Sequence, residues 1–471
     1  MATVGAKRAD CAEEPFRRGP IFDSMGGLEP LDRLLASLCR CCQSLPDRRS
    51  ETNTQYEMAD FGLAAFSVFF MQSPSFLEYQ RHLATGQGRS NCETLFGMSK
   101  IPGDSQVRAK LDPIEPSRFD PMFDAVIKEL QRSGGINQFR RLNGHVLIAL
   151  DGTQYHSSNK VSCPQCSIRH HGNGKTEYHH DMPAATLVAP GHNRVVPLIP
   201  EFIVPQDGHQ KQDCESRAAR RWLEAHGARY APLDPVFLGD DLFSRQPICE
   251  AVLAAGGHFL FVCKPASHPT IEEYRMGVRL DELKQRIKRG RDWFTYRYQW
   301  MSAVPLRGDT DAMNVNWLMI EIVSAAGKVT YRNSFVTSSF GNAGVPPTKR
   351  ETDLPVDRDT VVELAACGRA RWKIENESFN TLKNQGYNLE HNFGHGCRNL
   401  SAVLTTLNLP AFACHTVCDL AIPLWRAAAD KIGTRKRFFE HLRSFTVFLV
   451  FPSWRDILET LAFVKAAPRP P

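Results

Sequence analysis

Apolar residues recur at helical spacing along the first third of the chain. Segments 59–83 and 120–142 place them three or four residues apart, and Pro and Gly residues separate the two segments. This pattern predicts an all-helical domain over residues 55–142. Residues 1–54 are mostly polar, with one short helix expected at 28–42, and we expect them to form a mobile arm.

Short apolar runs replace the helical pattern after residue 142. Run 145–155 is apolar until it reaches an acid and a glycine, run 235–244 also reaches acids, and run 258–264 is a third strand-like apolar run. Helical segments at 216–228 and 247–257 alternate with these runs. The alternation predicts an α/β core with a mixed sheet flanked by helices.

A second β-rich region interrupts this core. Residues 290–345 are rich in aromatic and β-branched residues with turn signals between them, which predicts an inserted antiparallel β segment. The core then has a first part at 143–289 and a second, helical part at 346–440. A C-terminal helix and tail are expected over 441–471.

Composition and charge narrow the class of protein. The chain has 471 residues, of which 42% are hydrophobic and 23% charged, as in a folded, water-soluble protein. Its 57 Lys and Arg against 51 Asp and Glu give a net charge of +6, which permits a polyanionic partner without requiring one. The polar start and the absence of an apolar run long enough for a membrane span predict a cytoplasmic protein with no membrane partner and with reduced cysteines.

One helix carries a carboxylate where an apolar residue is expected. On the helix over 359–383, Trp372, Phe379 and Leu382 fall on one face, and Glu375 lies between them. A buried carboxylate is costly unless it is paired or binds a metal. Glu375 is therefore expected either to pair with Arg371, one turn before it, or to be a functional group, and the two interpretations are compatible.

Two further acids follow apolar runs. Asp151 ends the first core strand, and Asp240, with Asp241 beside it, ends a later one. Ligand sites in α/β sheets gather at the carboxyl ends of strands, and clustered carboxylates suit Mg²⁺ or Mn²⁺. Two such ions about 4 Å apart can drive phosphoryl transfer without a protein nucleophile. The alternative for any one of these acids is an ordinary turn or helix cap.

Three segments together resemble a known family. "LIALDGTQY" (147–155), "FLGDDLFS" (237–244) and "RWKIENESFNTLK" (371–383) resemble the signature segments of DDE transposases from bacterial insertion sequences. The resemblance is to the branch with a β-sheet insertion between the second Asp and the Glu, and it covers roughly residues 60–440. The helical region and the β-rich insertion fall where that family has them.

The resemblance implies a ribonuclease H-like core in which Asp151, Asp240 and Glu375 hold two Mg²⁺ or Mn²⁺ ions. Such an enzyme cleaves transposon ends and joins the 3′-hydroxyls to target DNA. Arg371 matches the family's basic residue and would orient Glu375 or contact a phosphate, and Lys383 matches the trailing lysine. The sequence departs from the pattern here, with seven residues instead of six between the Glu and the Lys. Either Lys383 still reaches DNA, or Glu377 is the catalytic acid; Glu375 is preferred because Glu377 falls on the far face of the helix.

The same pattern favours Asp240 over Asp241, because the family's second Asp usually stands three residues before an aromatic residue, here Phe243. The resemblance also implies a helical domain that binds DNA, a homodimer or higher oligomer on DNA, and a location at the bacterial nucleoid.

A cysteine and histidine cluster follows Asp151. Cys163 and Cys166 form a C-x-x-C knuckle, and a histidine pair further on can complete a tetrahedral zinc site; we take His171 and His180 as the candidates. The alternative is a surface hairpin with reduced thiols.

Basic and aromatic residues supply candidate DNA contacts. Arg217, Arg220 and Arg221 lie on a helix between the two Asp positions, and a basic run ahead of the insertion leads to Trp293 and Tyr296, which could stack on distorted DNA ends. The alternative for a basic helix is a solvated face. Two other functions remain open: a catalytically inactive DNA-binding relic, and a metal-dependent nuclease that cleaves without joining.

Overall fold

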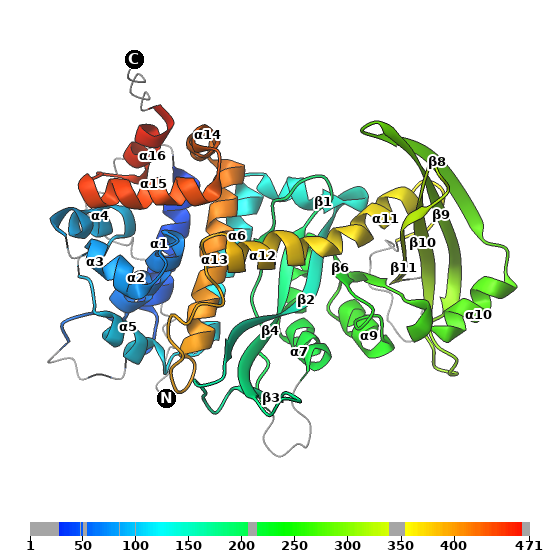
Figure 1. Cartoon of the computed structure of the whole chain (residues 1–471), viewed down its shortest axis with the longest axis horizontal. Coiled ribbons are helices and arrows are strands. Elements are labelled where there is room, and N and C mark those ends of the chain that lie inside the picture. Colours follow the sequence, from blue (N-terminus) through cyan, green and yellow to red (C-terminus); the bar gives the residue numbers. More distant parts are fainter. Residues whose placement is uncertain are drawn as a thin grey trace, which may run out of the picture.

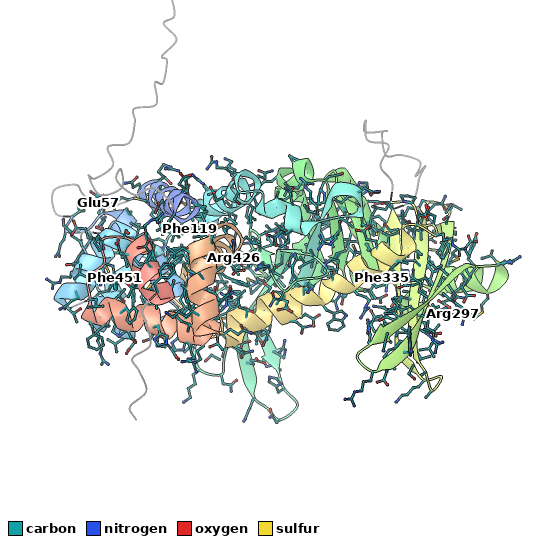
Figure 2. All side chains as sticks on the ribbon, turned by 90° about the horizontal axis from the view of Figure 1, so that it is seen from above. Glu57, Phe119, Arg297, Phe335, Arg426 and Phe451 are labelled. Carbon is teal, nitrogen blue, oxygen red and sulfur yellow. The ribbon has the colours of Figure 1, made fainter. Side chains whose placement is uncertain are left out.

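The computed structural model describes residues 28–47, 49, 54–83, 85–98, 100–205, 214–338 and 354–463. Helices from both ends of the chain gather at one end of an elongated molecule, a mixed sheet occupies the middle, and an antiparallel extension forms the other end (Figure 1). Seen from above, Phe451 in the helical part and Arg297 on the extension lie far apart (Figure 2). The expected mixed sheet flanked by helices is confirmed.

The helical body combines N-terminal and C-terminal segments. Buried apolar residues of both segments share one core, and α13 packs against α1, α2 and α6. The body consists of α1 (Glu29–Gln43), α2 (Met58–Phe70), α3 (Phe76–Leu83), α4 (Gly86–Phe96), α5 (Asp104–Leu111), α6 (Asp120–Arg132), α13 (Leu400–Ala421), α14 (Pro423–Ile432), α15 (Arg435–Phe448) and α16 (Trp454–Phe463).

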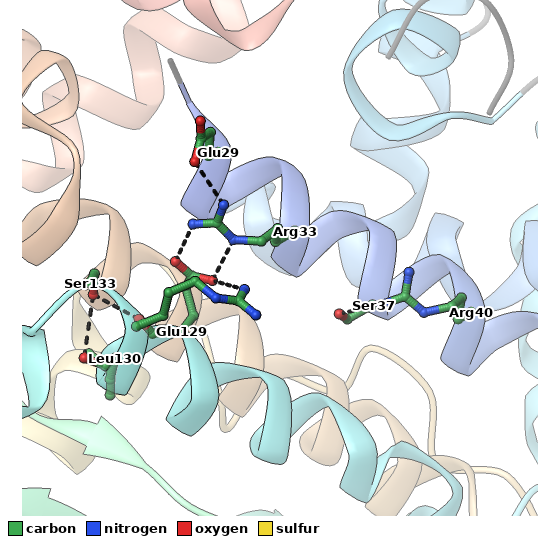
Figure 3. Close-up of polar contacts among 8 residues, drawn as sticks. Glu29, Arg33, Ser37, Arg40, Glu129, Leu130 and Ser133 are labelled. Atoms are coloured by element: carbon green, nitrogen blue, oxygen red, sulfur yellow. Dashed lines mark hydrogen bonds and ion pairs between the residues drawn. The ribbon is translucent and has the colours of Figure 1, made fainter. Parts of the chain in front are cut away.

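Helix α1 lies in the segment predicted to be a mobile arm. Its leucines at 31, 34, 35 and 38 are buried at helical spacing, and this apolar face packs on α2 and α6. Arg33 fixes the contact by donating to both carboxylate oxygens of Glu129, at 2.8 and 2.7 Å (Figure 3). The helix expected at 28–42 is thus present as α1, but it packs on the helical body and does not belong to a mobile arm. Residues 1–27 lie outside the described part of the chain.

Helix α13 has the length and composition of a membrane span. In its most apolar window, 94% of the residues are buried inside the protein. This burial is typical of the central helix of a globular core, because a membrane-spanning helix of one chain would expose its apolar side chains to lipid.

One sheet runs through the rest of the molecule in the order β3-β4-β2-β6-β7-β11-β10-β9-β8, with β1 on β2 and β5 on β4. Strands β2, β6 and β7 are parallel to one another. Strand β4 runs antiparallel to β2, and β5 runs antiparallel to β4, so β5 has the same direction as β2. The strands are β1 (Arg140–Arg141), β2 (His145–Ser158), β3 (Ser167–His170), β4 (Thr176–Val188), β5 (Val196–Pro197), β6 (Pro235–Gly239), β7 (His258–Val262), β8 (Asp281–Arg289), β9 (Asp292–Pro305), β10 (Asn314–Ser324) and β11 (Val329–Ser338).

Helices cover both faces of this sheet. Alternate residues of β2 enter two separate cores: Ile148 and Leu150 pack in the core that includes α7 and α9, whereas Leu147 and Ala149 pack in the core that includes α11. The bounds of the covering helices are α7 (Glu215–Trp222), α8 (Ala228–Tyr230), α9 (Gln246–Ala254), α10 (Pro269–Gly277), α11 (Val361–Arg369) and α12 (Asn380–Asn384).

The β-rich insertion is larger than predicted. It begins with β8 at Asp281 rather than at residue 290, because the basic run that precedes Trp293 forms a strand paired with β9. Strand β11 pairs antiparallel with β7, so the insertion continues the main sheet. Residues 339–353 lie outside the described part of the chain.

Candidate functional site

Asp151 and Glu375 meet at the point where two central strands separate. Strand β2 pairs with β6 only as far as Ala149, so Asp151 stands just beyond the last pair. Arg371 lies between the acids: its Nη1 donates to Asp151 Oδ2 at 3.1 Å and to Glu375 Oε1 at 3.0 Å. The expected ion pair between Arg371 and Glu375 therefore forms, and the same guanidinium also pairs with Asp151.

The electrostatics of this cluster favour a cation. Burial, followed by the neighbouring Glu375, raises the pKa of Asp151 to about 7, although Arg371 acts in the opposite direction. The side chain of Arg371 is buried, and its Nε atom has no hydrogen-bond partner within the described residues. The single positive charge of Arg371 does not neutralise the negative charges of Asp151 and Glu375. A divalent ion bound between these carboxylates would favour their charged forms.

Asp240 and Asp241 have different surroundings. The carboxylate of Asp241 accepts a backbone hydrogen bond from Lys264 at 2.6 Å and another from the Ser267 hydroxyl, so it fixes the loop after β7. The carboxylate of Asp240 accepts a hydrogen bond from the backbone of Leu242 at 2.8 Å, and its charge acts on Glu215 beside Asp151. Asp241 is thus engaged in fixing a loop, whereas Asp240 interacts electrostatically with Glu215; the preference for Asp240 as the catalytic acid stays a prediction.

The Glu375 helix contains a π-helical segment, Ile374–Phe379. Hydrogen bonds from i to i+5 accommodate one more residue per turn than an α-helix. In a regular α-helix, the eight residue-to-residue steps from Glu375 to Lys383 would separate the two side chains by about 80° around the helix axis. Because the π-helical turn accommodates one extra residue, the rotation corresponds to seven steps, and the two side chains differ by only about 20°. This local geometry compensates the extra residue between the two side chains. Lys383 Nζ pairs with Glu390 at 2.8 Å.

The apolar stripe on this helix differs in one position from the prediction. Phe379 and Leu382 are buried, but Trp372 is 46% exposed, and the Arg371 guanidinium lies 4.6 Å from its ring centre. The π-helical turn changes the angle between Trp372 and the residues that follow, so a constant 100° per residue misplaces it.

Glu215 is a fourth acid near this cluster that the sequence analysis missed. It begins α7, and its carboxylate lies against Gly152. Burial and the charge of Asp240 raise the pKa of Glu215. An acid in the first turn of a helix is common for helix stability alone, so the sequence offers no signal for this placement.

Cys163, Cys166, His180 and His395 form a cluster that could hold a metal ion. The two Sγ atoms are 3.8 Å apart, and His180 Nε2 lies 3.5 Å from each of them. His395 Nε2 lies 3.4 Å from Cys166 Sγ. Burial lowers the pKa of His180 to about 3 and also that of His395, so both imidazoles are neutral at pH 7, as metal ligation requires.

His395 takes the place predicted for His171. The β3–β4 hairpin carries His171 to an exposed position, where its Nε2 lies 2.9 Å from Glu177 Oε2. His395 belongs to the loop before α13, which Asp112 holds by accepting backbone hydrogen bonds from 397, 398 and 400. The sequence does contain histidines after the Glu375 helix, in the "HNFGHGC" stretch, but it does not predict how close they lie to Cys163 and Cys166 in space.

A second cluster consists of His145, Asp234 and His258. It lies at the N-terminal ends of the central strands β2, β6 and β7. Asp234 carboxylate oxygens lie 3.2 Å from His145 Nδ1 and 3.8 Å from His258 Nε2. These three residues could also hold a metal ion.

The arginines of α7 are engaged within the protein. Arg221 donates to Glu201 at 3.0 Å, and Arg220 pairs with Glu224 at 3.3 Å. Arg217 is exposed and also has an interaction within the chain. That these three arginines contact DNA stays a prediction.

The two aromatic candidates lie on opposite faces of the inserted sheet. Tyr296 is 4% exposed and packs in the core that α11 covers, so it is not available for stacking on DNA, and that prediction is wrong. Trp293 is 42% exposed, and the Arg286 guanidinium lies 5.1 Å from its ring centre. Trp293 stays a candidate.

Comparison with known proteins adds no identification. A scan against protein-family models finds no match, and no curated protein is significantly similar to the chain. Functional conclusions therefore depend on the residues and their arrangement.

Proposed function

We propose that the protein is a DNA transposase of an insertion sequence with a ribonuclease H-like core. The observation that carries this is the convergence of Asp151 and Glu375 on Arg371. The electrostatic effect of Asp240 on Glu215, which lies beside Asp151, supports it. The mixed sheet β5-β4-β2-β6-β7 supports the proposed core, with Asp151 inside β2 just beyond the last β2–β6 pair and Asp240 directly after β6.

The residues present fit a pair of Mg²⁺ or Mn²⁺ ions. Carboxylate oxygens are the ligands these ions prefer, and the glycine after Asp151 leaves space that another carboxylate enters. The ions would activate the attacking hydroxyl and stabilise the leaving oxygen. Asp151, Asp240 and Glu375 would hold them, Arg371 would keep two of these acids in position, and Lys383 would contact a phosphate.

Zinc is the ion we propose for the cysteine and histidine cluster. A tetrahedral zinc site has edges of about 3.8 Å between two thiolates and about 3.6 Å between a thiolate and an imidazole nitrogen. The observed separations are 3.8 Å for the thiol pair and 3.4–3.5 Å for three of the thiol–imidazole pairs. Such an ion would tie the hairpin after Asp151 to the segment after the Glu375 helix.

DNA is the proposed partner, and the mostly exposed strand β8 offers it a basic surface. Lys284, Arg286 and Lys288 project from one face of this strand beside Trp293, which suits a phosphate backbone with a stacked base. Binding as a homodimer or higher oligomer, at the bacterial nucleoid in the cytoplasm, belongs to the same proposal.

The test is cleavage and strand joining on DNA that carries the ends of the element encoding this chain, with Mn²⁺ or Mg²⁺. We expect wild type to cut the ends and join them to target DNA. Glu375→Gln should abolish both steps while DNA binding persists, and the matched control Glu377→Gln should keep activity. Free ends without joined products would favour a nuclease, and binding without cleavage under either metal would favour an inactive relic.

A further inference from the structure

The carboxylate of Glu215 fills the space left by the missing side chain of Gly152. A Cβ atom placed on Gly152 would lie 2.7 Å from Glu215 Cδ, 2.8 Å from Oε2 and 3.0 Å from Oε1. Non-bonded carbon and oxygen atoms do not approach so closely, so residue 152 must be glycine if Glu215 is to keep this position.

This contact brings Glu215 to the acidic cluster from the opposite side of the sheet. Alternation along β2 turns Asp151 toward the face with Arg371 and directs position 152 toward the face with α7. Because β6 no longer pairs with β2 beyond Ala149, the sheet is open at this point. A carboxylate that enters over Gly152 can therefore approach the same ion as Asp151.

The charges of the cluster are consistent with this placement. Asp240 is the charged group that acts most strongly on Glu215, and Glu215 in turn acts on Asp151. The guanidinium of Arg371 bonds to Asp151 and Glu375 and also acts electrostatically on Glu215. Placing like charges together in a partly buried site costs stability unless a cation is shared among them.

We propose that Glu215 is a fourth carboxylate ligand of the divalent ions held by Asp151, Asp240 and Glu375, and that Gly152 is the residue that admits it. The inference rests on the proposed function, because it assumes that divalent ions bind at this cluster. The competing explanation is that Glu215 only stabilises the N-terminus of α7.

The experiment measures Mn²⁺ binding to the purified full chain without DNA, by calorimetry and by the electron paramagnetic resonance signal of free Mn²⁺. Glu215→Gln removes the charge at nearly constant shape, and Gly152→Ala displaces the carboxylate while all four acids remain. Glu224→Gln is the control for the first change, since Glu224 is 59% exposed on the helical segment that follows α7. Gly172→Ala is the control for the second, because a Cβ there meets no atom within 4 Å.

We expect two Mn²⁺ ions to bind wild type, and both Glu215→Gln and Gly152→Ala to lose one ion or to weaken its binding at least about tenfold. The two controls should bind as wild type does. Circular dichroism and thermal unfolding establish that each variant is folded.

Two outcomes would overturn the inference in distinguishable ways. If wild type binds Mn²⁺ and Asp151→Asn abolishes this binding, but Glu215→Gln binds normally, Glu215 serves only its helix and the proposed function stands. If wild type binds no Mn²⁺, or if Asp151→Asn leaves binding unchanged, the proposed function fails together with the inference.

Discussion

The substitution His395→Ala is expected to remove the zinc ligand that links the two segments farthest apart in sequence. Cys166 and His395 are 229 residues apart in sequence, whereas Cys163 and His180 are separated by only 17. If the metal is treated as a cross-link, closing a loop of that length is worth about 5 kcal/mol in a chain-entropy treatment. This is an upper value, because packing around the loop already restricts the chain. We therefore expect His395→Ala to lower the free energy of unfolding by about 2–5 kcal/mol.

The assay combines zinc content by elemental analysis with denaturant unfolding, before and after a chelator. Wild type should hold one zinc, and His395→Ala should lose it to a mild chelator that leaves wild type loaded. The matched control, His171→Ala, should keep both zinc and stability, because His171 is exposed and pairs with Glu177. After complete removal of the metal, wild type and His395→Ala should differ by no more than about 1 kcal/mol, since the tie is then absent from both.

The reasoning is refuted if His171→Ala loses its zinc and His395→Ala keeps it. It is refuted equally if wild type prepared without chelators contains no zinc, or if complete zinc removal leaves its stability unchanged.

Three further results are expected. Asp240→Asn should abolish DNA cleavage without lowering the melting temperature, whereas Asp241→Asn should cost about 1–3 kcal/mol in thermal unfolding because its carboxylate accepts two hydrogen bonds. The pKa of Asp151 is raised to about 7, so the folded, metal-free protein binds a proton that the unfolded chain has released. Its stability should accordingly fall as pH rises from about 4 to 7, and a smaller fall in Asp151→Asn, measured by denaturant unfolding, checks this. Tyr296→Ala should destabilise the buried face by about 3–5 kcal/mol, while Trp293→Ala should weaken DNA binding in fluorescence anisotropy without changing stability; the reverse pattern would contradict the assigned faces.

The sequence predicted the features that depend on local patterns. Asp151 and Asp240 follow apolar runs, and Glu375 interrupts an apolar stripe, so each carries its signal within about ten residues. The interleaving of strands and helices likewise predicted the α/β class.

Features that depend on distant contacts could not be predicted in this way. His395 joins the cysteine and histidine cluster from more than 200 residues away, and the carboxylate of Glu215 lies against Gly152, a residue far from it in the chain. The face on which Tyr296 lies depends on where α11 packs, and strand alternation alone does not identify the covered face. The exposure of Trp372 follows from a π-helical turn, which a regular helical period does not anticipate.

The most direct test of the central claim is an anomalous diffraction map from crystals of the full chain grown with Mn²⁺. The account predicts two Mn²⁺ peaks about 4 Å apart among the carboxylates of Asp151, Asp240 and Glu375. A map with Mn²⁺ bound elsewhere and no peak at these three acids would contradict the proposed two-ion site.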